Sequence, residues 1–499
     1  MTLPPRHLLS KSTFLYGSQC AKRLYLYKFR PDLKEEVSNQ QQAVFDRGTN
    51  VGILARNLFP GGVDASPEST FEYQKAAVKT SELIASGTQI IYEAVFQFDG
   101  VLAAIDILVK DRGKWKAYEV KSTTQVKDIH ITDAALQYHV ITNSGILLAD
   151  ISIVHLNTEY IRKGKLMITE LFEQESVKTE AIEMQAEIRK TISELKAMLA
   201  KKQEPKVDIG PHCSDPYECD FMDYCWSHIP EVSVFSIARL RSNKKFELYN
   251  KGIIHYKEVR DEIELTSYQQ LQVDSHLNKK GHIDKESIRA FIATIPFPLY
   301  FLDFETFQSA IPLYDQSRSY QQIPFQYSLH SQKSHDSTIQ HFEFLADAKG
   351  GDPRFPFIEQ LLAETQNPGL ILTYNKSFEK SILTALARDF PKHSIALENL
   401  IDRLRDLMVP FQQGMYYLPE MNGSYSIKNV LPALIPALSY DDLEIGDGSS
   451  ASLAFEEMMY NPDADIPGIR KNLLGYCGLD TLAMVRILQQ IKSKSSSNH

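Results

Sequence analysis

The stretch that decides the fold of the first half of the chain is IIYEAVFQFDGVLAAIDILVKDRGKWKAYEVK, residues 90–121. Apolar and polar residues alternate along it, and two turn signals, Asp99-Gly100 and Asp111-Arg112-Gly113, interrupt it. Because such residues between alternating runs are typical of hairpins, the stretch predicts three consecutive strands. A helix is then expected over AALQYHVITN (134–143), short strands over 147–169, and one long helix over 177–199.

The size and charge of the chain exclude several classes of protein. With 499 residues it is about three times the usual domain size, so more than one hydrophobic core is expected. Its apolar runs are far shorter than the ~20 residues that span a bilayer, and no apolar segment precedes an N-terminal cleavage site. We therefore expect a cytoplasmic protein without membrane contact. The net charge of −9 excludes a polycation that coats nucleic acid by bulk charge.

The first forty residues differ from the rest, because seven basic residues outnumber three acidic ones there and aromatic residues such as Phe14 and Tyr16 lie between them. A surface that follows phosphates and stacks bases has this composition. A solvated helix face with a buried aromatic side has the same composition, and both interpretations stay open.

A second α/β region begins at LYFLDFETF, residues 299–307. Strands are expected at 325–330, 337–345 and 369–374, with a helix at 355–365 before the last of them. We therefore predict a first domain over 1–230, a helical connector over 231–295, a second domain over 296–492 and a disordered tail over 493–499. The connector is interpreted as structural, with a helix-turn-helix-like nucleic-acid contact as the alternative.

Three residues of the first domain suggest a metal site. Asp106 lies in the second predicted strand, and Glu119 and Lys121, two residues apart, point to one face of the third. Mg²⁺ or Mn²⁺ is bound by such carboxylates and can lower the pKa of a bound water, while the lysine stabilises developing charge. Alternating Glu and Lys on a solvent-facing strand is the plain structural alternative.

This arrangement, followed by a helix with Gln137 and Tyr138, resembles the PD-(D/E)xK nucleases of the RecB and AddB type. The resemblance implies a restriction-endonuclease-like fold, with Asp106 and Glu119 as metal ligands, Lys121 positioning the water or stabilising the developing charge, and Gln137 and Tyr138 at the DNA path. The lead-in Ala104-Ile105 lacks the proline of the motif. The histidine that many relatives place after a glycine on an early helix is also missing from residues 47–52, and Glu93 is a substitute candidate.

Four of the five cysteines bracket this domain. Cys20 stands alone, whereas Cys213, Cys219 and Cys225 follow almost two hundred residues later with the spacing C-x5-C-x5-C. Four thiolates can bind a [4Fe-4S] cluster or one Zn²⁺ ion. The placement resembles the iron–sulfur-stapled nucleases of the AddB and CRISPR-associated RecB-like kind, although their trio is usually C-x2-C-x5-C. We expect a [4Fe-4S] cluster, with zinc as the alternative.

The second domain carries its own acidic residues. Asp303 and Glu305 share one face of an otherwise apolar strand, where two acids are costly unless a cation neutralises them. Tyr476 and Asp480 lie four apart on a predicted helix, and Glu379 follows a strand in YNKSFEKSIL (374–383).

This order of motifs resembles the DEDD exonucleases of the RNase H-like fold, in the subtype that carries a tyrosine. The resemblance implies two metal ions held by Asp303, Glu305, Glu379 and Asp480, with Tyr476 orienting the attacking water. Relatives more often have Asp at the position of Glu379, and Asp402 and Asp406 are further candidates. Cys477 is interpreted as a small buried apolar residue.

Together these features predict a metal-dependent DNA nuclease, an exonuclease acting on single-stranded or free ends in repair, recombination or defence. The alternatives are a single active site, an RNA substrate, or a non-catalytic nucleic-acid-binding protein stapled by the cluster. An electron-transfer role is less favoured, because no G-x-G-x-x-G fingerprint follows a strand.

Overall fold

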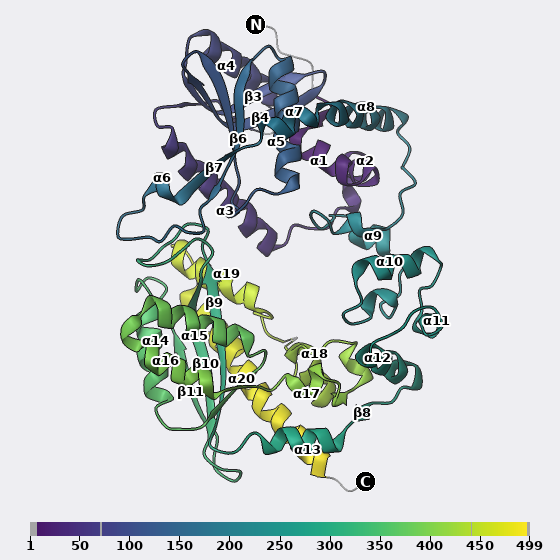
Figure 1. Cartoon of the computed structure of the whole chain (residues 1–499), viewed down its shortest axis with the longest axis vertical. Coiled ribbons are helices and arrows are strands. Elements are labelled where there is room, and N and C mark those ends of the chain that lie inside the picture. The colour runs from purple at the N-terminus through teal and green to yellow at the C-terminus, as the bar shows by residue number, and fades with distance from the viewer. Residues whose placement is uncertain (1–6, 70–71, 441, 497–499) are drawn as a thin grey trace. The chain divides into compact units, whose positions relative to one another are not determined.

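The chain is described here by a computed structural model that covers residues 7–69, 72–440 and 442–496 (Figure 1). It forms two compact units, residues 1–228 with 309–320, and residues 229–308 with 321–499. The segment 231–295, predicted as a connector, therefore belongs to the second unit. Residues 309–320, which the sequence assigned to the second domain, belong to the first.

The first unit is built on a mixed seven-stranded sheet of order β2-β3-β4-β5-β6-β7, with β1 paired to β4. The turns Asp99-Gly100 and Arg112-Gly113 have positive φ at both residues, as tight hairpin turns require. The three predicted strands are thus confirmed. The strands are β1 (Leu9–Ser10), β2 (Val63–Asp64), β3 (Ile90–Phe98), β4 (Val101–Asp111), β5 (Lys114–Val120), β6 (Leu148–Leu156) and β7 (Phe172–Ser176).

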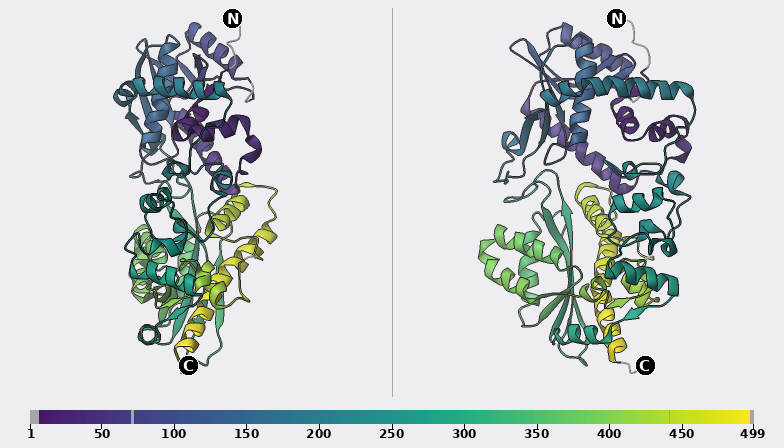
Figure 2. Two further views of the ribbon diagram at one scale, coloured as in Figure 1. Left: turned by 90° about the vertical axis from the view of Figure 1, so that its right-hand side faces the viewer. Right: turned by 45° about the vertical axis from the view of Figure 1, so that its right-hand side comes forward.

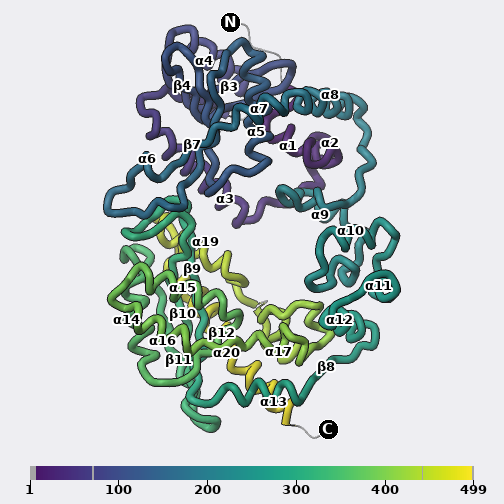
Figure 3. The backbone as a smooth tube through the Cα atoms, viewed as in Figure 1, coloured from purple at the N-terminus to yellow at the C-terminus, as the bar shows by residue number. Residues whose placement is uncertain are grey.

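Helix α5, labelled in Figure 3, connects β5 to its parallel neighbour β6. Its buried face, with Leu136 and Val140, joins the apolar core on one side of the sheet. The helices of the unit are α1 (Lys11–Gln19), α2 (Ala21–Phe29), α3 (Asn39–Ala55), α4 (Tyr73–Ala85), α5 (Asp128–Asn143), α6 (Ile168–Leu171), α7 (Lys178–Glu183), α8 (Gln185–Lys201) and α9 (Met222–Trp226).

The single long helix predicted over 177–199 is wrong, because the chain forms two helices, α7 and α8, that meet at Met184. The side chain of Gln185 donates to the carbonyl oxygen of Ala181 at 2.6 Å and to that of Ala135 at 3.0 Å. The side-chain amide of Gln185 thus donates to the carbonyl oxygen of Ala181, which in an uninterrupted helix would accept from the backbone N–H of Gln185.

The second unit contains a five-stranded sheet of order β11-β10-β9-β12-β13. Strands β11, β10 and β9 are antiparallel neighbours, whereas β12 and β13 run parallel to β9. A separate two-stranded ladder joins β8 to β14. The strands are β8 (His282–Ile283), β9 (Leu299–Gln308), β10 (Gln322–Gln332), β11 (Gln340–Leu345), β12 (Leu370–Thr373), β13 (Leu404–Asp406) and β14 (Tyr416–Tyr417).

Helices cover both faces of this sheet, with α14 to α16 on one side and α19 and α20 on the other (Figure 2). The helices are α10 (Ser242–Asn250), α11 (Tyr256–Val259), α12 (Ser267–Asn278), α13 (Lys285–Ala293), α14 (Arg354–Glu364), α15 (Ser377–Asp389), α16 (Ser394–Arg403), α17 (Val409–Gln412), α18 (Ile427–Leu434), α19 (Gly448–Tyr460) and α20 (Ile466–Ser496).

The disordered tail predicted from residue 493 is wrong for residues 493–496, which continue α20, and residues 497–499 lie outside the described residues. Ser495 is buried, and its carbonyl oxygen accepts a hydrogen bond from Arg289 at 3.0 Å. This contact with Arg289 therefore supports the last turn of α20, which lies beyond the apolar pattern in the sequence.

The mixed α/β class predicted from the sequence is confirmed. Across the described ranges, no helix is both long enough and apolar enough to cross a membrane.

Candidate functional site

The first candidate site forms where β3, β4 and β5 lie side by side. Tyr92 pairs with Ile107 and Ala94 pairs with Ile105, so the register sets Glu93 opposite Asp106. Glu93 has a φ of 52°, a strained conformation that is common at functional sites. From β5, the backbone N–H of Val120 donates to Oδ2 of Asp106 over 2.6 Å, which orients the aspartate toward Glu119.

Two lysines and two acids form a closed ring of alternating charges beside Asp106. The ammonium of Lys121 lies 2.7 Å from Oε1 of Glu119 and 2.5 Å from Oδ2 of Asp133. The ammonium of Lys11, on α1, lies 2.6 Å from the same Glu119 oxygen and 3.4 Å from the same Asp133 oxygen. The predicted pair Glu119 and Lys121 is therefore joined by Lys11 and Asp133, two residues that belong to none of the predicted motifs.

Helix α5 contributes Gln137 to this site. Its amide nitrogen donates to Oε2 of Glu119 at 2.6 Å and to the carbonyl oxygen of Ala104 at 2.9 Å. Oδ1 of Asp133 and Oε1 of Gln137 are buried acceptor atoms without a hydrogen-bond partner among the described residues. Tyr138, predicted at the DNA path, is partly buried and packs against the apolar core. One face of α5, with Asp133 and Gln137, therefore belongs to the site.

The charges in this site shift the pKa values of its two central acids in opposite directions. Burial and the neighbouring charge of Glu119 raise the pKa of Asp106 to about 8. Burial acts in the same direction on Glu119, but the ammonium groups of Lys11 and Lys121 outweigh it and hold its pKa far below the usual range. Burial also raises the pKa of Glu93, despite its 3.1 Å ion pair with Arg56. A cation would therefore favour ionisation of Asp106 and Glu93.

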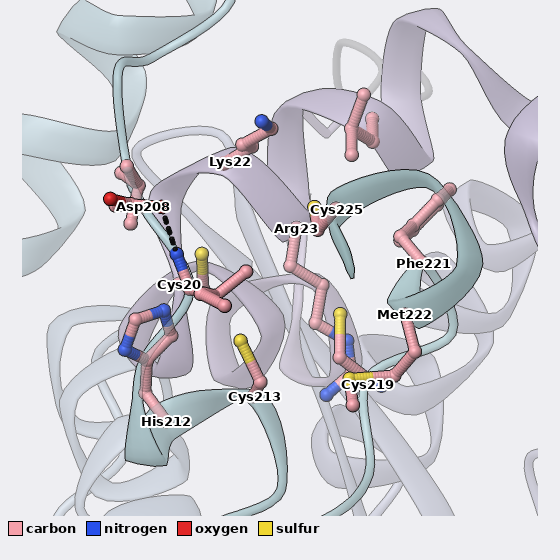
Figure 4. A pocket seen from close by; sticks show the side chains of 13 residues that line it. Cys20, Lys22, Arg23, Asp208, His212, Cys213, Cys219, Phe221, Met222 and Cys225 are labelled. Atoms are coloured by element: carbon pink, nitrogen blue, oxygen red, sulfur yellow. Dashed lines mark hydrogen bonds between the residues drawn. The ribbon is translucent and has the colours of Figure 1, made fainter. Parts of the chain in front are cut away.

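The four cysteines of the first unit line one small cavity (Figure 4). Cys20 lies between α1 and α2, while Cys213, Cys219 and Cys225 come from the loop that ends in α9. These residues, almost two hundred positions apart in sequence, thus converge as the sequence analysis expected. All four are free thiols, and Cys213 and Cys219 are buried.

Hydrogen bonds and an ion pair join the N-terminal segment to the loop of Cys213, Cys219 and Cys225 at this cavity. The side-chain amide of Gln19 donates to the carbonyl oxygens of His212 at 2.6 Å and Tyr217 at 2.7 Å. Arg23, which is 5% exposed, forms a 3.0 Å ion pair with Asp220. Burial raises the pKa of Cys219 to about 11, and the positive charge of Arg23 opposes that shift. A cationic centre bound to the sulfurs would favour their thiolate forms.

The spacing of the four sulfurs bears on the kind of centre that they could hold. In a tetrahedral zinc site with Zn–S bonds of about 2.3 Å, the sulfurs lie about 3.8 Å apart. Within the described part of the chain, no three of these sulfurs approach one another within 4.8 Å. The donor set fits a soft metal centre, and its spacing is wider than a single zinc ion requires.

The second candidate site forms between β9 and α20. Asp303 and Glu305 point to one face of β9, and Tyr476 and Asp480 face them from one side of the helix. Glu305, Tyr476 and Asp480 are buried, and the charge of Asp480 acts on both strand carboxylates. The structure therefore brings together the acids of two predicted motifs that are more than 170 residues apart.

Glu379 reaches the same group of charges from the first turn of α15. It is 1% exposed, and its Oε2 atom has no hydrogen-bond partner among the described residues. The fallback candidate Asp406 accepts backbone hydrogen bonds from Asn375, Lys376 and Met408 over 2.9–3.1 Å. Asp406 therefore holds the loop that positions Glu379.

Three further residues complete the second site. The hydroxyl of Tyr440 donates to Oδ1 of Asp480 over 2.6 Å. Lys428 lies with its ammonium 5.7 Å from the ring centre of Tyr476, and its charge acts on Glu305 and Asp480. Cys477 is fully buried, as expected, but its sulfur lies 3.7 Å from Oδ2 of Asp303 and within 4.8 Å of a Glu305 oxygen.

Burial and mutual repulsion raise the pKa values of the acids in this second site. The pKa of Asp303 and that of Glu305 lie well above the usual range, chiefly through burial and then through the charge of Asp480. Burial raises the pKa of Asp480 to about 6, and burial with the nearby charge of Asp406 raises that of Glu379 to about 8. These oxygen ligands suit hard divalent cations, which would relieve the repulsion.

The basic and aromatic N-terminal segment has both buried and exposed parts. Phe14 and Arg23 are buried, and Arg23 stacks on Tyr16 at 4.2 Å from its ring centre. Tyr27 and Phe29 of α2 are exposed. Part of the segment is therefore structural, and the rest presents aromatic side chains to solvent.

Two comparisons with known proteins found a similarity. The family described as "Domain of unknown function (DUF2779)" matches residues 300–426. The chain is also similar to the Uncharacterized protein UU173 of Ureaplasma parvum serovar 3, with 27% identity over 139 residues. That similarity covers 24% of this chain and 20% of the relative, so the chain spans about a fifth of the relative's length. Residues 300–426 are thus similar to a domain family of unknown function.

Proposed function

We propose that this protein is a metal-dependent DNA nuclease, most plainly an exonuclease that hydrolyses phosphodiester bonds at single-stranded ends. The observation that carries the proposal is the convergence of Asp303, Glu305, Glu379 and Asp480, a half-buried and three buried carboxylates, all with raised pKa values. Such a group is costly without cations and is well suited to hold them. Two bound Mg²⁺ or Mn²⁺ ions would activate water and stabilise the leaving oxygen.

The strand order of the second unit supports an RNase H-like interpretation. Three antiparallel strands, β9 to β11, are followed by β12 and β13 parallel to β9, and the acids lie on the central strand β9 and the last helix. In this interpretation Tyr476 orients the attacking water, and Tyr440 and Lys428 hold Asp480 in its ionised form.

The first unit supports a second, PD-(D/E)xK-like site. Asp106 and Glu119 would hold the divalent ion, Glu93 is an additional ligand candidate, and Gln137 orients Glu119 through its 2.6 Å hydrogen bond. Lys121 would stabilise charge on the phosphate during cleavage. Asp133, 2.5 Å from the ammonium of Lys121, keeps that lysine charged and in place.

The cysteine cavity is proposed to hold a [4Fe-4S] cluster that fastens the N-terminal segment to the loop of Cys213, Cys219 and Cys225. The convergence of the four thiols in one cavity supports a shared centre, and their wide spacing favours a cluster over a single zinc ion. Its role in this proposal is structural, since the site closes a loop of almost two hundred residues.

The decisive experiment incubates end-labelled single- and double-stranded DNA and RNA with the protein and Mg²⁺ or Mn²⁺. Wild type is compared with Asp106→Ala, Asp303→Ala and the double variant. We expect cleavage of single-stranded DNA that needs metal and falls at least 10²-fold when the active site is removed. If one single variant equals the double variant, only that site cleaves.

Intact substrates with wild-type protein under all conditions would overturn the enzyme proposal. Preferential cleavage of RNA would keep the chemistry and change the substrate. A matched control is Asp336→Ala, since Asp336 is exposed and lies outside both candidate sites. Its activity should equal that of the wild type.

A further inference from the structure

The ring of Lys11, Glu119, Lys121 and Asp133 uses every oxygen of Glu119. Oε1 contacts both ammonium groups, at 2.6 and 2.7 Å, and Oε2 accepts from Gln137 at 2.6 Å. Because each carboxylate oxygen offers two lone pairs, Oε1 is fully used by its two ammonium contacts, whereas Oε2 keeps one lone pair. A metal ion that bound Oε1 would therefore have to replace one of its present contacts, and the three partners of Glu119 differ in how readily they can leave.

Lys121 is poorly placed to leave, because it lies two residues from Glu119 on β5 and is also held 2.5 Å from Asp133. Gln137 is completely buried and is fixed by a second hydrogen bond to the carbonyl oxygen of Ala104. Lys11 has the weakest second contact, 3.4 Å to Asp133, and its side chain is 27% exposed. It is therefore the partner that can turn toward solvent or substrate.

Lys11 also reaches the site from a different part of the fold. It is the first residue of α1, whose N-cap Ser10 is held by reciprocal hydrogen bonds with Thr13. Residue Cys20, at the other end of this helix, lines the cysteine cavity. The nine residues of α1 span roughly 13 Å at 1.5 Å each, so one short rigid helix connects the two locations.

We propose that Lys11 is an internal cation of the first site that competes with the divalent metal for Glu119. In the metal-free protein its ammonium neutralises Glu119 and Asp133, and an arriving ion displaces it from Glu119 Oε1. The displaced ammonium stays beside the ion on its flexible stem, where it can contact an anionic substrate. This inference rests on the proposed function, since it needs Asp106 and Glu119 to bind a metal.

The test measures Mn²⁺ affinity by electron paramagnetic resonance of the free ion, in full-length protein that carries Asp303→Ala and Asp480→Ala to silence the second site. Lys11→Met should tighten Mn²⁺ binding by roughly tenfold or more, because it removes a positive charge from beside the ion. Lys11→Arg keeps the charge and should bind Mn²⁺ within about threefold of the background protein.

The matched control is Lys116→Met, on the same strand as Glu119 but paired with Asp111 at 3.1 Å and outside the ring. It should leave Mn²⁺ affinity unchanged. If Lys11→Met binds Mn²⁺ no more tightly than Lys116→Met, the competition is refuted even when the site binds metal. If the background protein binds no Mn²⁺ and Asp106→Ala changes nothing, the proposed function of this site fails, and the inference fails with it.

A possible loss of folding in Lys11→Met is checked by thermal unfolding and by circular dichroism. Lys11→Gln, which retains a hydrogen-bond donor near Glu119, provides a second uncharged variant. Both uncharged variants should tighten binding, and a folded variant of either kind that does not do so overturns the inference.

Discussion

The hydroxyl of Tyr440 donates a hydrogen bond to Oδ1 of Asp480 over 2.6 Å, and both side chains are buried. A donor to a charged carboxylate stabilises its ionised form, and removing it leaves a buried acceptor unsatisfied. We therefore expect Tyr440→Phe to raise the pKa of Asp480 above about 6 and to weaken Mn²⁺ binding at the second site roughly tenfold at pH 6–7. Titration of Mn²⁺ in an Asp106→Ala background measures the effect.

Tyr417 provides the control for this substitution. It is also buried, and its hydroxyl accepts a hydrogen bond from the backbone N–H of Gly423 at 2.9 Å, away from the carboxylates. Tyr417→Phe should lower the free energy of unfolding by about 1 kcal/mol without changing metal affinity. Equal metal affinities for the two variants would show that Tyr440 does not act through Asp480.

The buried carboxyl of Glu379 predicts that a neutral side chain at this position stabilises the metal-free protein. Its pKa of about 8 lies above the usual value, so the folded protein binds a proton that the unfolded chain releases. Stability should therefore fall as pH rises from about 4.5 to 8, and above pH 8 the buried charge destabilises the fold by a few kcal/mol. Glu379→Gln removes this charge and should raise the Tm in EDTA by several degrees at pH 9, and by less at pH 6, where only part of the pH-dependent loss of stability has occurred.

The same substitution should reduce the stabilisation that Mn²⁺ gives to the wild type, because the amide is a weaker ligand. Differential scanning calorimetry at pH 6 and 9, with and without Mn²⁺, separates the two effects. Glu398→Gln, at an exposed position of α16, serves as the control and should shift neither value. A lower Tm for Glu379→Gln at pH 9 would contradict the assigned burial of a charge.

The chain order of strands and turns could be predicted from local sequence, whereas the complete sites could not. Asp106, Glu119 and Lys121 follow from strand alternation and from two turns whose residues adopt positive φ. Lys11 lies 108 residues before its partner Glu119, and no periodicity relates the two positions. Asp133 could have been identified from the sequence, because it lies four residues before Gln137 and shares its helix face.

The same distinction holds in the second site. The pairs Asp303 with Glu305 and Tyr476 with Asp480 have spacings that identify one face of a strand or helix. Tyr440 comes from irregular chain before α19, where no spacing rule applies, and only the folded arrangement shows that it reaches Asp480. The break between α7 and α8 was missed for a related reason, since the Gln185 side chain substitutes for a backbone donor.

The raised pKa of Asp106, about 8, predicts that metal binding at the first site releases a proton. At pH 7 the metal-free aspartic acid is mostly protonated, so Mn²⁺ affinity should rise up to about tenfold per pH unit below pH 8 and level off above it. Calorimetric titration at pH 7 of the protein that carries Asp303→Ala and Asp480→Ala, in buffers of different ionisation enthalpy, should report close to one proton released per ion. Asp106→Asn should abolish that release, and an affinity that is flat from pH 6 to 9 would contradict the prediction.

The convergence of the cysteines in one cavity predicts that a single substitution destabilises two segments that are far apart in the sequence. The segment of Cys20 and the loop of Cys213, Cys219 and Cys225 are joined by the contacts of Gln19 and Arg23, by the packing of Leu26 against Phe221 and, in the proposed holoprotein, by the bound centre. Closing a loop of this length stabilises the fold by about 4–5 kcal/mol, so Cys20→Ser should lower the Tm of the first unit markedly.

Limited proteolysis should then cut the Cys20→Ser variant both near α2 and in the loop of residues 205–225, while the second unit stays intact. Metal analysis and visible absorption after anaerobic purification identify the centre, with iron and a broad absorption near 400 nm expected for a cluster, on the order of four irons per chain. Cys477→Ser is the matched control, because Cys477 lies in the other unit and should leave the metal content of this cavity unchanged. Colourless protein with one bound zinc ion would show that the centre is zinc and not a cluster. Wild-type protein that the protease cuts as readily as Cys20→Ser would contradict the structural role of the centre.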